Sequence, residues 1–99
     1  MDMETLMAQA SALRNKVTAA QERLASMHVK GVADNGAVIV DMTGKYDLAG
    51  IQISDELASR GGAAVSDAVA RAYMDAKAKA DELIDRVMGD ATAGVPLPE

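Results

Sequence analysis

An unbroken heptad pattern of apolar residues near the start of the chain places the strongest limit on its fold. The apolar positions alternate between spacings of three and four, and they are Met3, Leu6, Ala10, Leu13, Val17, Ala20, Leu24 and Met27. This spacing forms one apolar stripe along an α-helix, and no Gly or Pro interrupts residues 1–30. We predict a helix over about residues 4–27, roughly 36 Å long at 1.5 Å per residue. A small domain cannot bury a stripe of this length, so part of it must pack on another long helix.

The chain then changes to the two-residue period of β-strands. Two short apolar runs, residues 28–33 and 37–43, flank Asn35 and Gly36. Asn-Gly is the strongest short hairpin signal, because a type I′ turn needs positive φ at both central residues. We therefore predict two antiparallel strands joined by a two-residue turn.

A third strand is predicted over residues 46–53, after a turn at Gly44-Lys45. The apolar residues of this segment occupy even positions before Ala49-Gly50 and odd positions after it. Such a change of face predicts a β-bulge. The three strands together form an antiparallel meander.

A second long helix is predicted over about residues 63–88, after a short capped helical turn at 54–57. Its apolar positions are Val65, Val69, Ala72, Ala76, Ala80, Leu83 and Val87. Gly89 predicts the end of the helix, since glycine is favoured just after a helix C-terminus. We expect one domain over residues 1–89, followed by a flexible Gly- and Pro-containing tail over 90–99.

The composition favours a protein that completes its core with a partner chain. The 99 residues include no Phe and no Trp, and the apolar residues are mostly Ala, Val and Met. These side chains fill little volume each, so the core of a monomer would be thin. We expect an obligate oligomer.

Several classes of protein are disfavoured by the residues that the chain lacks. It has no cysteine, a single histidine (His28), and neither a GxGxxG motif nor a phosphate-binding loop. No run approaches the ~20 apolar residues of a membrane span, and the first residues do not resemble a signal peptide. We expect a cytoplasmic protein that is not an enzyme, with no cofactor, metal, membrane or small-molecule substrate.

Basic residues form a narrow stripe beside the apolar stripe of the first helix. Residues 5–21 contain Arg14 and Lys16 and no acid, and Lys16, Arg23 and Lys30 share one heptad position. A basic stripe suits DNA phosphates, because each neutralised phosphate releases counterions. A solvated flank of a coiled coil gives the same pattern.

The second helix carries charges of alternating sign. Spacings of four predict three ion pairs, Asp75–Lys79, Lys77–Asp81 and Glu82–Arg86. Lys77, Lys79 and Arg86 are therefore weaker candidates for phosphate contact. The net charge of −5 also argues against binding nucleic acid through bulk charge.

Short motifs follow one another in a characteristic order over nearly the whole chain. They are Leu6-Met7-Ala8-Gln9-Ala10, Val29-Lys30-Gly31, Gly36-Ala37-Val38-Ile39-Val40, Gly44, Ile51-Gln52-Ile53-Ser54, Leu57, residues 65–76 and Gly94-Val95-Pro96-Leu97-Pro98. Their order and spacing resemble the YbaB/EbfC family of bacterial nucleoid-associated proteins.

The resemblance implies an α+β fold with an α-β-β-β-α protomer, whose three-stranded antiparallel meander lies between two long helices. It implies a tweezer-like homodimer that binds double-stranded DNA with low sequence specificity, and a role in nucleoid organisation or gene regulation. On this hypothesis Arg14, Lys16, Arg23 and Lys30 contact phosphates, with Lys77, Lys79 and Arg86 as secondary candidates. The alternative left open is a dimeric protein-interaction module that does not bind DNA.

Overall fold

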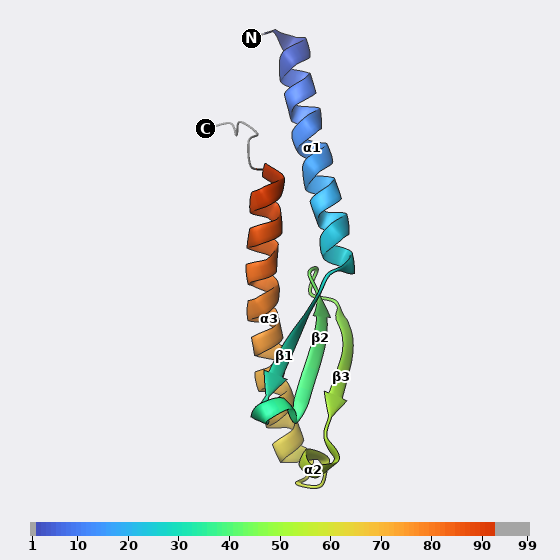
Figure 1. Ribbon diagram of the computed structural model, residues 1–99, viewed down its shortest axis with the longest axis vertical. Helices are drawn as coiled ribbons and strands as arrows, with labels where there is room; N and C mark the ends of the chain where they lie inside the picture. The colour runs from blue at the N-terminus through green and yellow to red at the C-terminus, as the bar shows by residue number, and fades with distance from the viewer. Residues whose placement is uncertain (1, 93–99) are drawn as a thin grey trace.

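The computed structural model describes residues 2–92. The elements in chain order are α1 (Met3–Ser26), β1 (His28–Ala33), the 3-10 turn η1 (Asp34–Gly36), β2 (Val38–Thr43), β3 (Leu48–Ile53), α2 (Asp55–Ala58) and α3 (Gly62–Thr92). The sheet packs against the first part of α3, and α1 runs beside the second part of α3 and beyond it (Figure 1). The molecule measures 67 × 21 × 16 Å along its principal axes. The predicted α+β fold and its α-β-β-β-α order are confirmed.

Helix α1 begins and ends close to the predicted residues because both ends have local hydrogen-bond partners. At its start, the Asp2 carboxylate accepts a hydrogen bond from the backbone N–H of Thr5 at 2.7 Å. At its end, the N–H of Gly44 lies 3.0 Å from the carbonyl oxygens of both Leu24 and Met27. A Cβ at Gly44 would lie 2.8 Å from the carbonyl oxygen of Leu24. The turn between β2 and β3 can therefore pack against the end of α1 only if residue 44 is glycine.

The sheet is antiparallel in the order β1-β2-β3. The predicted bulge is confirmed: Asp41 lies opposite Gly50 while Met42 lies opposite Leu48, which leaves Ala49 as the extra residue of β3. Helix α3 covers β1 and β2, where alternate residues of β2 are fully buried. Strand β3 lies farther from α3 (Figure 1), and all six of its residues are exposed.

Strand β1 lies so close to α3 that only glycine fits between them. A Cβ on Gly31 would lie 2.0 Å from the carbonyl oxygen of Ala72 and 2.4 Å from the backbone nitrogen of Ala76. The helix contributes equally small side chains, and Ala68, Ala72, Ala76 and Ala80 are all completely buried. The core between β1 and α3 is therefore thin, since the backbones of the two elements are in direct contact.

The apolar stripe of α1 is divided between two environments. Its inner part packs on α3, where Ala20 and Leu24 form a buried cluster with Leu83 and Val87. Its outer part, residues 3–12, is exposed throughout. The prediction that this stripe needs a second long helix is thus confirmed for the inner part, since α3 supplies that helix.

Three local predictions were wrong. Helix α3 continues through Gly89 to Thr92, because a glycine inside a helix costs only about 1 kcal/mol relative to alanine. The hairpin turn is longer than two residues, with positive φ at Asp34, Asn35 and Gly36. Tyr46, predicted in a strand, has a φ of 66° and lies in the turn before β3. The predicted flexible tail falls mainly on residues 93–99, outside the described residues.

Candidate nucleic-acid interface

Two charged residues of α3 close the outer edge of β1. The Asp75 carboxylate accepts a hydrogen bond from the N–H of Val32 at 2.9 Å. The Lys79 ammonium donates to the carbonyl oxygen of Lys30 at 2.8 Å and pairs with Asp75 at 2.9 Å. The hydrogen bond from the Val32 N–H has the largest effect on the pKa of Asp75 and lowers it, and the hydrogen bond from Lys79 lowers it further. The predicted Asp75–Lys79 pair is confirmed, and Lys79 is already engaged within the protomer.

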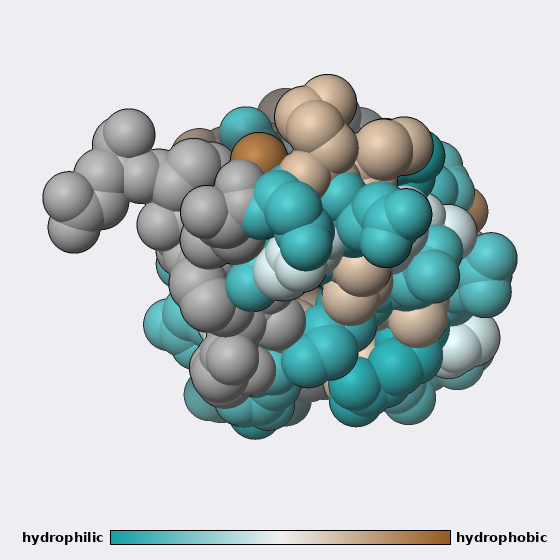
Figure 2. All heavy atoms as spheres, turned by 90° about the horizontal axis from the view of Figure 1, so that it is seen from above, coloured by the Kyte–Doolittle hydropathy of each residue, from teal (hydrophilic) through white to brown (hydrophobic). Residues whose placement is uncertain are grey.

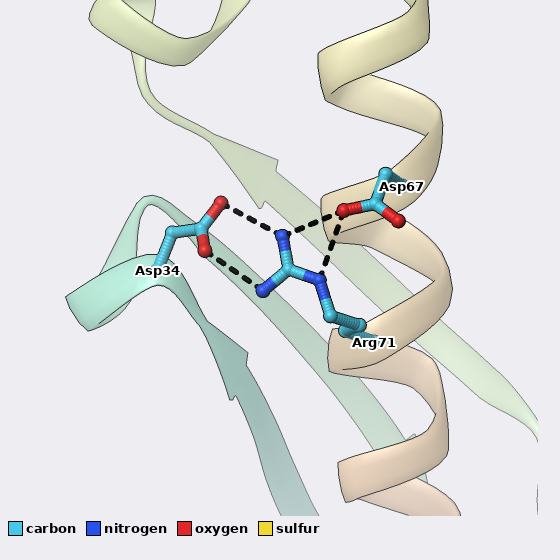
Figure 3. A network of polar contacts seen from close by, with 3 residues as sticks. All are labelled: Asp34, Asp67 and Arg71. Atoms are coloured by element: carbon cyan, nitrogen blue, oxygen red, sulfur yellow. Dashed lines mark hydrogen bonds and ion pairs between the residues drawn. The ribbon is translucent and has the colours of Figure 1, made fainter.

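A second ionic contact attaches the first hairpin turn to α3 (Figure 3). Two guanidinium nitrogens of Arg71 donate to the two carboxylate oxygens of Asp34, at 2.8 and 3.1 Å. The same guanidinium pairs with Asp67 at 3.0 Å. These hydrogen bonds lower the pKa of Asp34 and raise that of Arg71, so both groups stay ionised. Arg71 therefore has a structural role.

The basic residues of α1 differ from these because they are exposed and unpaired. Within residues 2–92, none of Arg14, Lys16 and Arg23 forms an ion pair. Lys16 and Arg23 line a shallow groove between α1 and the end of α3, together with Ala19, Ala20, Asp90 and Ala91. This groove brings together two of the seven predicted site residues, Lys16 and Arg23, and Arg14 lies two positions before Lys16 on α1.

The remaining candidates, Lys30, Lys77 and Arg86, lie apart from that groove and are also exposed. The predicted pairs Lys77–Asp81 and Glu82–Arg86 do not form. Asp81 instead accepts a hydrogen bond from the hydroxyl of Tyr46, which raises the pKa of that phenol. The Asp81 carboxylate, which the sequence pattern pairs with Lys77, therefore binds the turn before β3 instead.

Sequence analysis missed one exposed surface, the α3-facing side of β3. Leu48, Ile51 and Ile53 lie opposite buried residues of β2, yet each is between 40% and 54% exposed. The alternation of apolar residues identifies the face, but it does not show that α3 stops short of it. No strand of the described chain pairs with the outer edge of β3.

Within residues 2–92, no three or more Asp, Glu, His or Cys side chains gather where they could hold a metal ion. His28 hydrogen-bonds Asp41 through Nδ1 at 2.8 Å on the exposed side of the sheet. None of the helices in this part of the chain has the length and apolar character to cross a membrane.

Comparison with known proteins identifies the family. The model of the YbaB/EbfC DNA-binding family matches residues 1–95. The chain belongs to this family. A nucleoid-associated protein of Gluconobacter oxydans is 40% identical over 94 residues, which cover 94% of this chain and 88% of that protein. Another nucleoid-associated protein, from Phenylobacterium zucineum, is 37% identical over 99 residues, with 96% of this chain and 92% of the relative covered.

A solved structure supports the YbaB/EbfC fold independently. An uncharacterised protein of Helicobacter pylori superposes with a TM-score of 0.79 at 19% identity, covering 91% of this chain and 96% of that one. At this identity the likeness shows the fold alone. The predicted family membership is therefore confirmed by sequence, and the predicted architecture of the protomer by structure.

Proposed function

We propose that the chain is a homodimer that binds double-stranded DNA in the nucleoid with low sequence specificity, and that it catalyses no reaction. Membership in a DNA-binding family supports this role, as do relatives named nucleoid-associated proteins. The observation that carries the proposal is the unpaired basic surface of α1 in an acidic protein. Arg14, Lys16 and Arg23 are the proposed phosphate contacts, and Lys30, Lys77 and Arg86 are secondary ones.

The distribution of ion pairs reconciles this role with the net charge of −5. Of the ten lysines and arginines, only Arg60, Arg71 and Lys79 form ion pairs with carboxylates of the described chain. Contacts to phosphate depend on charge within about one Debye length, ~10 Å at 0.1 M salt, and not on the total charge. Long basic side chains along a helix contact phosphates without reading base edges, which supports low specificity.

Salt titration of DNA binding tests this function. Three contacts on each chain of a dimer neutralise about six phosphates, so the slope of log K against log salt should be about −5. Affinity should therefore fall roughly 10³-fold between ~50 and ~200 mM salt. Two unrelated duplexes of equal length should bind within a few-fold of each other. Absence of a complex at ~50 mM salt would instead favour a protein-interaction module.

The dimer is proposed to form through β3. The β1 edge is closed by Asp75 and Lys79. Within residues 2–92, β3 has an unpaired outer edge beside exposed Leu48, Ile51 and Ile53. Tyr73 on α3 is also exposed. An unpaired edge with an apolar face is the kind of surface that a second strand covers.

Replacing Ile51 with lysine should separate the proposed dimer. The substitution places a charge on the apolar side of β3, and we expect the mass to fall from two chains towards a single chain of 10.3 kDa. Gln52→Lys is the matched control, because the neighbouring side chain points to the other side of the sheet. Sedimentation equilibrium measures both. A two-chain mass for Ile51→Lys would show that the dimer forms elsewhere.

A further inference from the structure

We propose that the outer part of α1 is a second self-association surface, which pairs in antiparallel orientation with the same segment of another copy. It would join molecules end to end, independently of the β3 contact. The proposal goes beyond DNA binding, since it concerns how dimers assemble into larger units.

The first observation is that the start of an unbroken apolar stripe, residues 3–10, is exposed in the described chain. Met3 and Leu6 of the stripe are 71% and 47% exposed, and Met7 beside it is 64% exposed, while Ala20 and Leu24 of the same stripe are buried against α3. Figure 1 shows α1 continuing beyond the end of α3. Figure 2 looks onto this end of the molecule and shows apolar residues lying open among polar ones. A heptad stripe is suited to a helical partner.

The buried residues restrict the register of such a pair. Ala20 and Leu24 already contact α3, and Leu13 and Val17 are half-buried, so the open part of the stripe runs from Met3 to Ala10 with Leu13 at its limit. An antiparallel pair over this part places Met3 against Leu13 of the second copy, and Leu6 against Ala10 of the second copy. The two outer layers then pair large side chains with each other, and the two inner layers pair the large Leu6 with the small Ala10. Met7 meets its own counterpart beside the stripe. The contact is two-fold symmetric, as in most protein dimers.

The charges favour the same orientation. Asp2 and Lys16 share one heptad position, with the uncharged Gln9 midway between them. In the antiparallel register, Asp2 of each copy lies beside Lys16 of the other, so two ion pairs form. A parallel pair would leave these charges at opposite ends. Within residues 2–92 the Asp2 carboxylate pairs with no cation, and one of its oxygens caps Thr5.

Mass measurement without DNA tests the contact. Sedimentation velocity on the full chain, from ~1 to ~200 µM, should show the mass rising above the smallest unit with concentration. Leu6→Glu should weaken this association by at least about a hundredfold. Each of the two copies would place one unpaired carboxylate in an apolar layer of the contact. Ala8→Glu is the matched control: it adds the same charge to α1 on the side opposite the stripe, and it should assemble like the wild type.

A double-mutant cycle tests the orientation. Asp2→Asn keeps the helix cap and removes the charge, while Lys16→Gln removes the other partner. Each should weaken assembly by roughly three- to tenfold, as expected for two exposed ion pairs, and the double variant should be no worse than either single one. Additive losses would overturn the antiparallel register.

The outcomes separate this contact from the proposed function. Leu6→Glu should keep the two-chain mass and wild-type DNA affinity, whereas Ile51→Lys should lose the two-chain mass. A wild-type mass that does not change up to ~200 µM would overturn the proposal. Equal assembly by Leu6→Glu and Ala8→Glu would overturn it as well.

Discussion

Replacing both Lys16 and Arg23 with glutamate is expected to reduce affinity for duplex DNA by more than about a hundredfold at ~100 mM salt. The two side chains line one groove and are unpaired within residues 2–92, so both are available to phosphate. A dimer loses four phosphate contacts, which should flatten the slope of log K against log salt by three to four units. Fluorescence anisotropy at nanomolar protein measures both quantities at concentrations where association through α1 is negligible.

The control for this experiment is Lys45→Glu combined with Arg60→Glu. It changes the net charge by the same amount, but neither residue lies on α1. If bulk charge governs binding, the two double variants should lose affinity equally. If the α1 stripe is the contact surface, only the Lys16 and Arg23 variant should lose both affinity and slope. Unchanged binding by that variant would refute the site assignment.

The second large effect concerns Gly31, where alanine should destabilise the protein by about 3 kcal/mol. The added Cβ would lie 2.0 Å from the carbonyl oxygen of Ala72. Neither the β1 nor the α3 backbone can move away without disturbing the core, so the substitution overpacks the core severely. The midpoint of thermal unfolding should fall by more than about 10 °C. Circular dichroism during heating and urea titration measures the change.

Gly50→Ala is the matched control for this substitution. Gly50 also lies in the sheet, but a Cβ there would meet nothing within 4 Å. Its stability should change by less than about 1 kcal/mol, the general cost or gain of replacing a strand glycine. A similar small change for Gly31→Ala would mean that β1 and α3 are more loosely packed than the structure indicates.

Features that depend on neighbouring residues could be predicted from the sequence. The bounds of α1 follow from a continuous heptad and a capping aspartate, and the bulge at Ala49 follows from a change in apolar alternation. Features that depend on contacts between distant residues could not be predicted from the sequence. Tyr46 leaves the strand because its hydroxyl reaches Asp81, 35 positions along the chain. Gly89 does not end α3, because glycine permits a helix end without requiring one.

The candidate site, too, could be predicted only where it depends on neighbouring residues. Unpaired cations on α1 follow from the absence of acids in residues 5–21, a local property. On α3, spacings of four predict three ion pairs, and only Asp75–Lys79 forms. That pair has a second role at the β1 edge, which no local pattern reveals. Lys79 therefore drops out of the proposed contacts, while Lys77 and Arg86 become more available than their spacing indicates.

The contacts of Asp75 and Lys79 with β1 also limit growth of the sheet. A protomer that could gain strands on both sides would polymerise without end, as amyloid-forming segments do. Here one side is occupied by the protomer's own helix, so the proposed joining of two copies through β3 would give a closed six-stranded sheet from two sheets of three. Any longer assembly would then have to use the exposed surfaces of the helices.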